Sequence, residues 1–88
     1  MRKVILMIPR IKKLETRDDF KLIVSFDSGE TVVYDVNDDI SNIPDFSVLK
    51  TEIGLFDNAQ IDESRTCVFW NDRVDLASDT LLEYGRRV

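Results

Sequence analysis

The segment that most constrains the fold of this chain is residues 20–36, which read FKLIVSFDSGETVVYDV. Apolar and polar side chains alternate along its first half, stop at a polar tripeptide and then alternate again. Because successive side chains of a strand point to opposite faces, the pattern predicts a β-hairpin with one apolar face. An isolated hairpin is marginally stable in water, so the rest of the chain is expected to cover that face.

The register of this hairpin also follows from the pattern, because residues paired across two antiparallel strands point to the same side of the sheet. A two-residue turn of Ser28 and Gly29 would set apolar residues opposite the wrong face. A three-residue loop that begins at Asp27 gives the pairs Phe26–Glu30, Val24–Val32, Leu22–Tyr34 and Phe20–Val36. It also puts Gly29 at a left-handed position, which glycine adopts without steric strain.

The remaining segments predict a single α+β domain over residues 1–88, with a mostly antiparallel small sheet and two short helices. A strand over residues 4–14 and a turn at residues 16–19 precede the first hairpin, and a polar connection follows it. Asp45 is expected to cap a short helix in which Phe46, Leu49 and Ile53 recur at helical spacing as core residues. A second hairpin is expected over residues 58–70, and a terminal helix runs from Ser78 to a stop at Gly85.

The charges of the chain are unevenly distributed. The net charge is −5, yet residues 1–17 contain six basic residues against one acidic residue, and residues 18–83 contain four basic against sixteen acidic. The basic segment has no interleaved aromatic residues, and the acidic body would repel a nucleic-acid backbone. We therefore expect Lys and Arg to protect an exposed edge strand, and we do not expect direct nucleic-acid binding.

The residue types exclude several functions. Histidine is absent, which removes Ser-His and Cys-His nucleophilic pairs and the commonest transition-metal ligand. We therefore expect no cofactor, no metal site and no catalytic residue. The lone Cys67 leaves no internal disulfide, and the apolar run of residues 4–8 is too short for a signal peptide or a membrane span, so a cytoplasmic location is predicted.

One partial metal motif is present and fails. Asp35, Asn37 and Asp39 match the first three ligand positions of an EF-hand loop. The sixth position is Ile40 instead of glycine, and the twelfth is Phe46 instead of glutamate, so no calcium site is predicted.

Several motifs together resemble the small bacterial family called domain of unknown function 2442. They are the Phe26–Gly29 hairpin, the Phe-x-x-Leu segment with a later Phe at Phe46, Leu49 and Phe56, and the end motif at Trp70, Asn71, Asp75, Leu76, Asp79 and Leu81. The similarity covers about residues 9–84, with Ser28 inserted in the first motif and Ser78 in place of the usual proline. The resemblance implies a small α+β domain. It also implies an arrangement similar to a toxin and antitoxin pair, because many members look to be encoded beside another small protein.

Three functions remain open from the sequence. The first is a non-enzymatic interaction module that dimerises or binds a small basic partner protein, with Val4, Leu6 and Ile8 as an oligomer or partner edge. The second is a small-molecule-binding or weakly catalytic site made of Trp70, Asn71, Asp72 and Asp75. The third is an acidic decoy that occupies a nucleic-acid-binding site on another protein, and it predicts binding that weakens steeply with salt.

Overall fold

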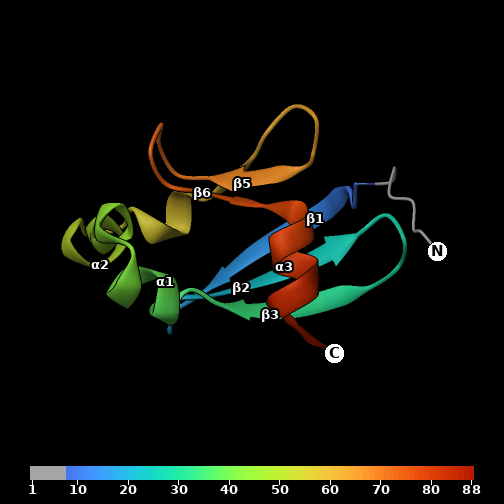
Figure 1. Ribbon diagram of the computed structural model, residues 1–88, viewed down its shortest axis with the longest axis horizontal. Coiled ribbons are helices and arrows are strands. Elements are labelled where there is room, and N and C mark those ends of the chain that lie inside the picture. Colours follow the sequence, from blue (N-terminus) through green and yellow to red (C-terminus); the bar gives the residue numbers. More distant parts are fainter. Residues whose placement is uncertain (1–7) are drawn as a thin grey trace.

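Two antiparallel sheets form the framework of the protein in a computed structural model that describes residues 8–88 (Figure 1). The first sheet has the strand order β1-β2-β3-β7, and the second has the order β4-β5-β6. The strands are β1 (Ile11–Arg17), β2 (Lys21–Phe26), β3 (Thr31–Asp35), β4 (Gln60–Ile61), β5 (Cys67–Phe69), β6 (Asp75–Ala77) and β7 (Arg86–Arg87). The predicted α+β class with antiparallel pairing is confirmed.

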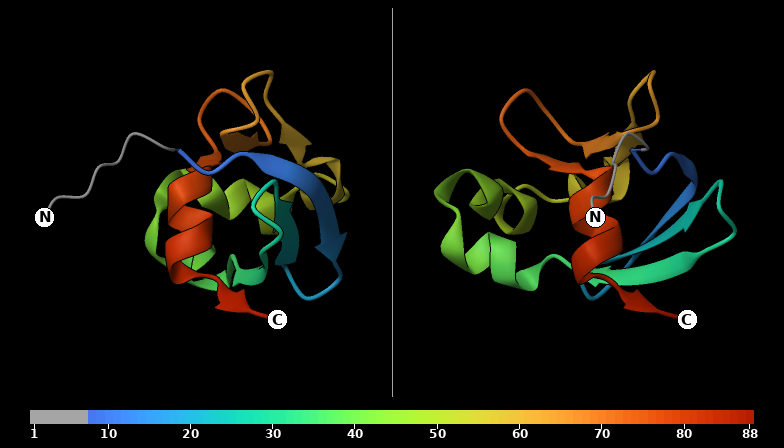
Figure 2. Two further views of the ribbon diagram at one scale, coloured as in Figure 1. Left: turned by 90° about the vertical axis from the view of Figure 1, so that its right-hand side faces the viewer. Right: turned by 45° about the vertical axis from the view of Figure 1, so that its right-hand side comes forward.

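Short helices fill the space between and beside the sheets. They are α1 (Asn37–Asn42), α2 (Val48–Thr51), α3 (Ser78–Tyr84) and the 3-10 turns η1 (Pro44–Ser47) and η2 (Phe56–Asn58). The helices α1 and α2 gather at one end of the molecule, whereas α3 lies across the face of the first sheet below β6, as the turned views confirm (Figure 2). Among residues 8–88, no helix is long and apolar enough to cross a membrane.

The central hairpin has the predicted register. Leu22 pairs with Tyr34 and Val24 pairs with Val32. The amide of Phe26 donates to the carbonyl oxygen of Glu30 at 2.8 Å, which closes the three-residue loop. Gly29 has φ = 95°, the left-handed conformation that the loop requires.

The apolar face of the hairpin forms the floor of one continuous core. Leu22, Val24 and Val32 are fully buried, and Tyr34 is 8% exposed. The second sheet, α3 and the helical end cover this face, and each contributes a fully or nearly buried side chain such as Val68, Leu81 or Phe46. The two sheets therefore share a core, although no ladder joins them.

Several predicted features differ from the structure. The first strand, β1, begins at Ile11, so residues 8–10 of the predicted strand are not part of it; residues 4–7, which include Val4 and Leu6, lie outside the described residues. The polar connection contains α1, because Ile40 is buried and the Tyr34 hydroxyl donates to Asp39 at 2.7 Å, which fixes the turn. Asp45 does not cap a helix, since η1 begins with Pro44 and has no side-chain cap.

Ile53 was predicted to be a core residue, and this was wrong. The helix α2 ends at Thr51, two residues before Ile53, so the helical spacing that would have turned this side chain inward does not reach it. Ile53 is 102% exposed. The strand β7 was not predicted at all; it pairs Arg86 and Arg87 with β3.

Candidate functional site

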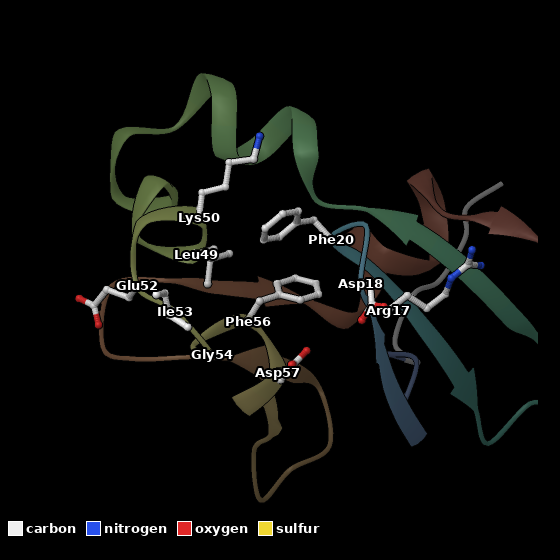
Figure 3. Close-up of a pocket in the computed structure, with 10 residues that line it drawn as sticks. All are labelled: Arg17, Asp18, Phe20, Leu49, Lys50, Glu52, Ile53, Gly54, Phe56 and Asp57. Carbon is white, nitrogen blue, oxygen red and sulfur yellow. The ribbon is translucent and has the colours of Figure 1, made fainter.

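A surface cleft of about 180 Å³ separates the loop between β1 and β2 from the segment that joins α2 to η2 (Figure 3). Its lining residues are Arg17, Asp18, Phe20, Leu49, Lys50, Glu52, Ile53, Gly54, Phe56 and Asp57. These residues come from two stretches of the chain that are about thirty positions apart, and the packing of the helical end against the first sheet brings them together. The cleft is our candidate functional site.

The floor of the cleft is apolar and aromatic. Leu49 and Phe56 are buried, whereas Phe20 is half-buried. The rings of Phe20 and Phe56 meet edge to face, with 5.2 Å between their centroids. This geometry is favourable for aromatic pairs and leaves part of the Phe20 ring available to another molecule.

The backbone of Phe20 is unusual, with φ = 61°. Three residues, Asp18 to Phe20, connect the paired residues Arg17 and Lys21, and the Phe20 amide donates to the Arg17 carbonyl oxygen at 3.2 Å. The loop after β2 has the same length and the same bond, but it uses Gly29 at the left-handed position. A left-handed conformation costs a non-glycine residue about 1–2 kcal/mol, so the loop holds this ring in place at the expense of backbone strain.

Trp70 holds the other ring of the floor. Its indole Nε1 donates to the carbonyl oxygen of Phe56 at 2.9 Å, and the two rings stack with centroids 5.7 Å apart. The Phe46 ring meets Trp70 edge to face at 6.4 Å. Trp70 is only 6% exposed, so it supports the cleft from behind and does not line it.

Charged side chains form the rim. Asp18, Glu52 and Asp57 are exposed, and so are Arg17 and Lys50. In Figure 3 the carboxylates of Asp18 and Asp57 lie at the end of the cleft beside Phe56, whereas the amine of Lys50 lies at the opposite end. Asp18 and Asp57 therefore place two carboxylates at one end of the cleft, and Lys50 places a cation at the other.

Neighbouring groups hold several of these rim residues. Asp57 Oδ1 accepts a hydrogen bond from the Thr16 hydroxyl at 3.2 Å. The guanidinium of Arg17 is 3.7 Å from Asp19 and points away from the cleft in Figure 3. Lys50 Nζ stands 5.6 Å from the centroid of the Phe20 ring. The lining side chains thus offer apolar contact, an aromatic face and charge.

The residues predicted to bind a ligand, Trp70, Asn71, Asp72 and Asp75, lie in and beside the turn after β5. Asn71 Oδ1 accepts hydrogen bonds from the amides of Arg73 and Val74, at 2.8 and 3.0 Å, which shapes the turn. Asp72 and Asp75 are exposed, and neither they nor Asn71 lines the cleft. The cleft therefore does not include these residues, and a ligand site at this turn stays a prediction.

The predicted partner edge is described only at Ile8, which is 60% exposed. Ile8 borders a wider surface hollow together with Pro9, Phe26, Thr66 and Leu82. This hollow adjoins residues 1–7, which the structure does not describe.

The thiol of Cys67 is poorly suited to nucleophilic chemistry. Burial raises its pKa, and the nearby carboxylates of Asp75 and Asp62 raise it further. A thiol with a raised pKa is mostly protonated at neutral pH and reacts slowly. Within the described part of the chain, no group of three or more His, Cys, Asp or Glu side chains is placed to hold a metal ion.

The sequence did not predict the cleft. Leu49 was correctly expected to be a core residue, whereas Phe20 was expected in the first strand of the hairpin and lies in the loop before β2. One signal was available: with Arg17 paired to Lys21, the connection has three residues, and its last residue must be left-handed.

A family model described as "Protein of unknown function (DUF2442)" matches residues 11–87. No curated protein and no solved structure matches the chain.

Proposed function

Because the chain belongs to the DUF2442 family, whose model spans nearly all of it, and the family description names no activity, we propose a function from the surface itself: a non-enzymatic interaction module that binds a small basic partner protein. The observation that carries the proposal is the charged and apolar surface of the helical end. In a two-protein system of the kind that the family resemblance implies, this chain is the acidic member. Its proposed place of action is the cytoplasm.

The helical end is strongly acidic. We define the acidic lobe as residues 35–58, which include α1, η1, α2 and η2. Its acidic residues are Asp35, Asp38, Asp39, Asp45, Glu52 and Asp57, and its one basic residue is Lys50. A surface of one sign attracts a partner of the opposite sign and speeds their association.

The acidic lobe also exposes apolar side chains. Ile43 is 41% exposed and Ile53 is 102% exposed. Protein interfaces typically have an apolar centre within a polar rim, and the lobe combines both kinds of surface. A partner that covers Ile53 would remove this side chain from water, with a gain of about 25 cal/mol for each Å² buried.

The size of the cleft favours a protein over a metabolite. Pockets for small molecules typically enclose roughly 300–1,000 Å³, and this cleft has about 180 Å³. Such a volume suits one side chain of a partner.

The proposal can be tested by isolating the tagged protein from its host and measuring the mass of what accompanies it. We expect a stoichiometric complex with a protein of net positive charge. The triple variant Asp38→Asn, Asp45→Asn, Glu52→Gln should weaken this complex, because it removes three exposed lobe charges. The matched control Glu63→Gln, Asp72→Asn, Asp75→Asn removes the same charge elsewhere and should retain it.

Two outcomes would contradict the proposal. One is a strict monomer that recovers no stoichiometric partner. The other is equal weakening by both triple variants, which would reflect net charge and not the acidic lobe. A defined complex of two copies, with no second protein, would instead favour the dimer that the sequence left open.

A further inference from the structure

The cleft has the volume and the lining to hold one long side chain. Its volume of about 180 Å³ is small, and its floor is the edge-to-face pair of Phe20 and Phe56 over Leu49. Lysine and arginine pack their aliphatic stems on apolar surfaces while the charged head stays in water. A side chain of this kind fits a cleft that is apolar at the floor and charged at the rim.

The aromatic face of the floor already attracts a cation. Lys50 of this chain places its amine 5.6 Å from the centroid of the Phe20 ring. Attraction of this kind arises from the negative face of the ring and operates within about 6 Å. The ring is therefore oriented so that a cation can approach it.

The carboxylate end of the cleft can receive a charged head. Asp18 and Asp57 both line the cleft and lie beside Phe56 at the end away from Lys50 (Figure 3). Arg17 also lines the cleft, but its guanidinium is 3.7 Å from Asp19 and points away from the cleft. A partner's cation would thus meet two carboxylates, in addition to the field of the acidic lobe.

From these three properties we infer that the cleft takes a single lysine or arginine side chain from a basic segment of a protein partner. The stem would lie on the rings of Phe20 and Phe56, and the head would lie between Asp18 and Asp57. Ile53, fully exposed on the same rim, would contact an apolar residue that neighbours the inserted cation. This inference rests on the proposed function, and it names the site and the residue type that the site recognises.

The recognition step can be measured without knowing the partner. The probe is N-acetyl-arginine amide, titrated into isotopically labelled protein while the backbone amide signals are followed by NMR. We expect concentration-dependent shifts at Phe20, Gly54 and Phe56. N-acetyl-citrulline amide has nearly the same shape without the charge, and we expect it to bind at least about fivefold more weakly.

Two variants of the cleft test the carboxylates and the ring separately. Asp18→Asn with Asp57→Asn should weaken arginine amide about fivefold, because each exposed charge contact contributes modestly. Phe20→Gly keeps the left-handed loop without strain, removes the ring and should weaken the probe about threefold. The matched control Asp72→Asn with Asp75→Asn changes the net charge equally and should bind as the wild type does.

The outcomes separate this inference from the proposed function. If arginine and citrulline amides bind equally, or if both cleft variants bind like the control, the inference is wrong. If a basic partner is recovered and the cleft variants bind it normally, the interaction module stands and the cleft assignment fails. If the probe binds at the cleft and no partner is recovered, the cleft assignment stands and the proposed interaction module fails.

Discussion

The guanidinium of Arg65 donates two parallel hydrogen bonds to the carboxylate of Asp27, from Nη1 to Oδ1 at 2.9 Å and from Nη2 to Oδ2 at 2.8 Å. Asp27 lies in the loop between β2 and β3, and Arg65 lies in the loop between β4 and β5, so the pair ties the two sheets together. The Arg65 backbone reinforces the connection, because its carbonyl oxygen accepts a bond from the Ile11 amide at 2.7 Å. Two parallel hydrogen bonds fix the orientation of the guanidinium relative to the carboxylate as well as the distance between them.

This pair predicts a pH-dependent contribution to stability. The hydrogen bond from Arg65 and then its charge lower the pKa of Asp27 below the usual 3.8, although partial burial acts in the opposite direction. A carboxyl with a lower pKa in the folded state stabilises the fold above pH 3.8, and this stabilisation is lost as the pH falls through the folded-state value. Asp27→Asn should therefore be less stable than the wild type at neutral pH, and the difference should shrink in acid.

Urea unfolding at about pH 7 and about pH 2.5 measures this difference. Asp72→Asn is the control, since Asp72 forms no ion pair within residues 8–88. A difference between Asp27→Asn and the wild type that persists unchanged in acid would show that the ion pair is not its source.

Much of the first sheet could be predicted because its information is local. The alternation of β2 and β3 and the position of Gly29 lie within seventeen consecutive residues, and together they determine the register. The bond between Arg65 and Asp27 spans 38 positions, and nothing in either neighbourhood indicates the other. Likewise β7 has only two residues and no alternation, so only its pairing with β3 defines it.

The cleft could not be predicted because it depends on where β1 and α2 end and on how the segments that follow them pack together. The α2 pattern predicted Leu49 correctly, but the helix stops before Ile53 and turns this side chain outward. The carboxylates of Asp18 and Asp57 belong to different stretches of the chain, which only tertiary packing brings to one hollow. Composition indicated an acidic body and could not indicate where the acidic residues meet an aromatic floor.

A side chain at position 85 is expected to clash with its neighbours and destabilise the fold. A Cβ at this position would lie 2.5 Å from the Leu81 carbonyl oxygen and 2.9 Å from side-chain atoms of Val32. The backbone and a buried β3 residue cannot easily move away, so Gly85→Ala should cost about 2–3 kcal/mol of unfolding free energy. Gly54→Ala is the informative comparison, because it meets no atom within 4 Å and is strained only by φ = 84°.

We expect Gly54→Ala to cost about 1 kcal/mol, less than the change at Gly85. Chemical denaturation of both variants gives the ranking. The opposite ranking would mean that α3 shifts easily against β3.

Replacement of Ser78 by alanine is expected not to destabilise the protein. Its side chain is fully buried, and its hydroxyl has no hydrogen-bond partner among the described residues. An unsatisfied buried polar group costs about 1–3 kcal/mol, and alanine removes it while leaving the backbone bond from the Ser78 amide to Thr66 intact. Ser78→Ala should therefore be as stable as the wild type or more stable by about 1 kcal/mol.

The contrast for Ser78 is Ser25→Ala, which removes a hydroxyl bonded to Thr31 at 3.1 Å. This variant should lose about 0.5–1.5 kcal/mol. The midpoint temperature of thermal unfolding should therefore be higher for Ser78→Ala than for Ser25→Ala. A loss at Ser78 as large as the loss at Ser25 would indicate that the Ser78 hydroxyl has a partner.

Trp70 links the stability of the domain to the shape of the cleft. Trp70→Phe keeps an aromatic ring but removes the Nε1 donor, which leaves the carbonyl oxygen of Phe56 with only the longer hydrogen bond from the Ala59 amide, at 3.3 Å. The loss of one buried hydrogen bond costs about 0.5–1.5 kcal/mol, so the urea concentration at the midpoint of unfolding should fall. Because Phe56 stacks on Trp70 and also contacts Phe20 edge to face, its ring should lose its fixed position, and the ring proton signals of Phe20 should shift. Tyr84→Phe changes an aromatic side chain that is 72% exposed and should alter neither property. Unchanged Phe20 signals in a destabilised Trp70→Phe protein would show that the floor of the cleft does not depend on the indole.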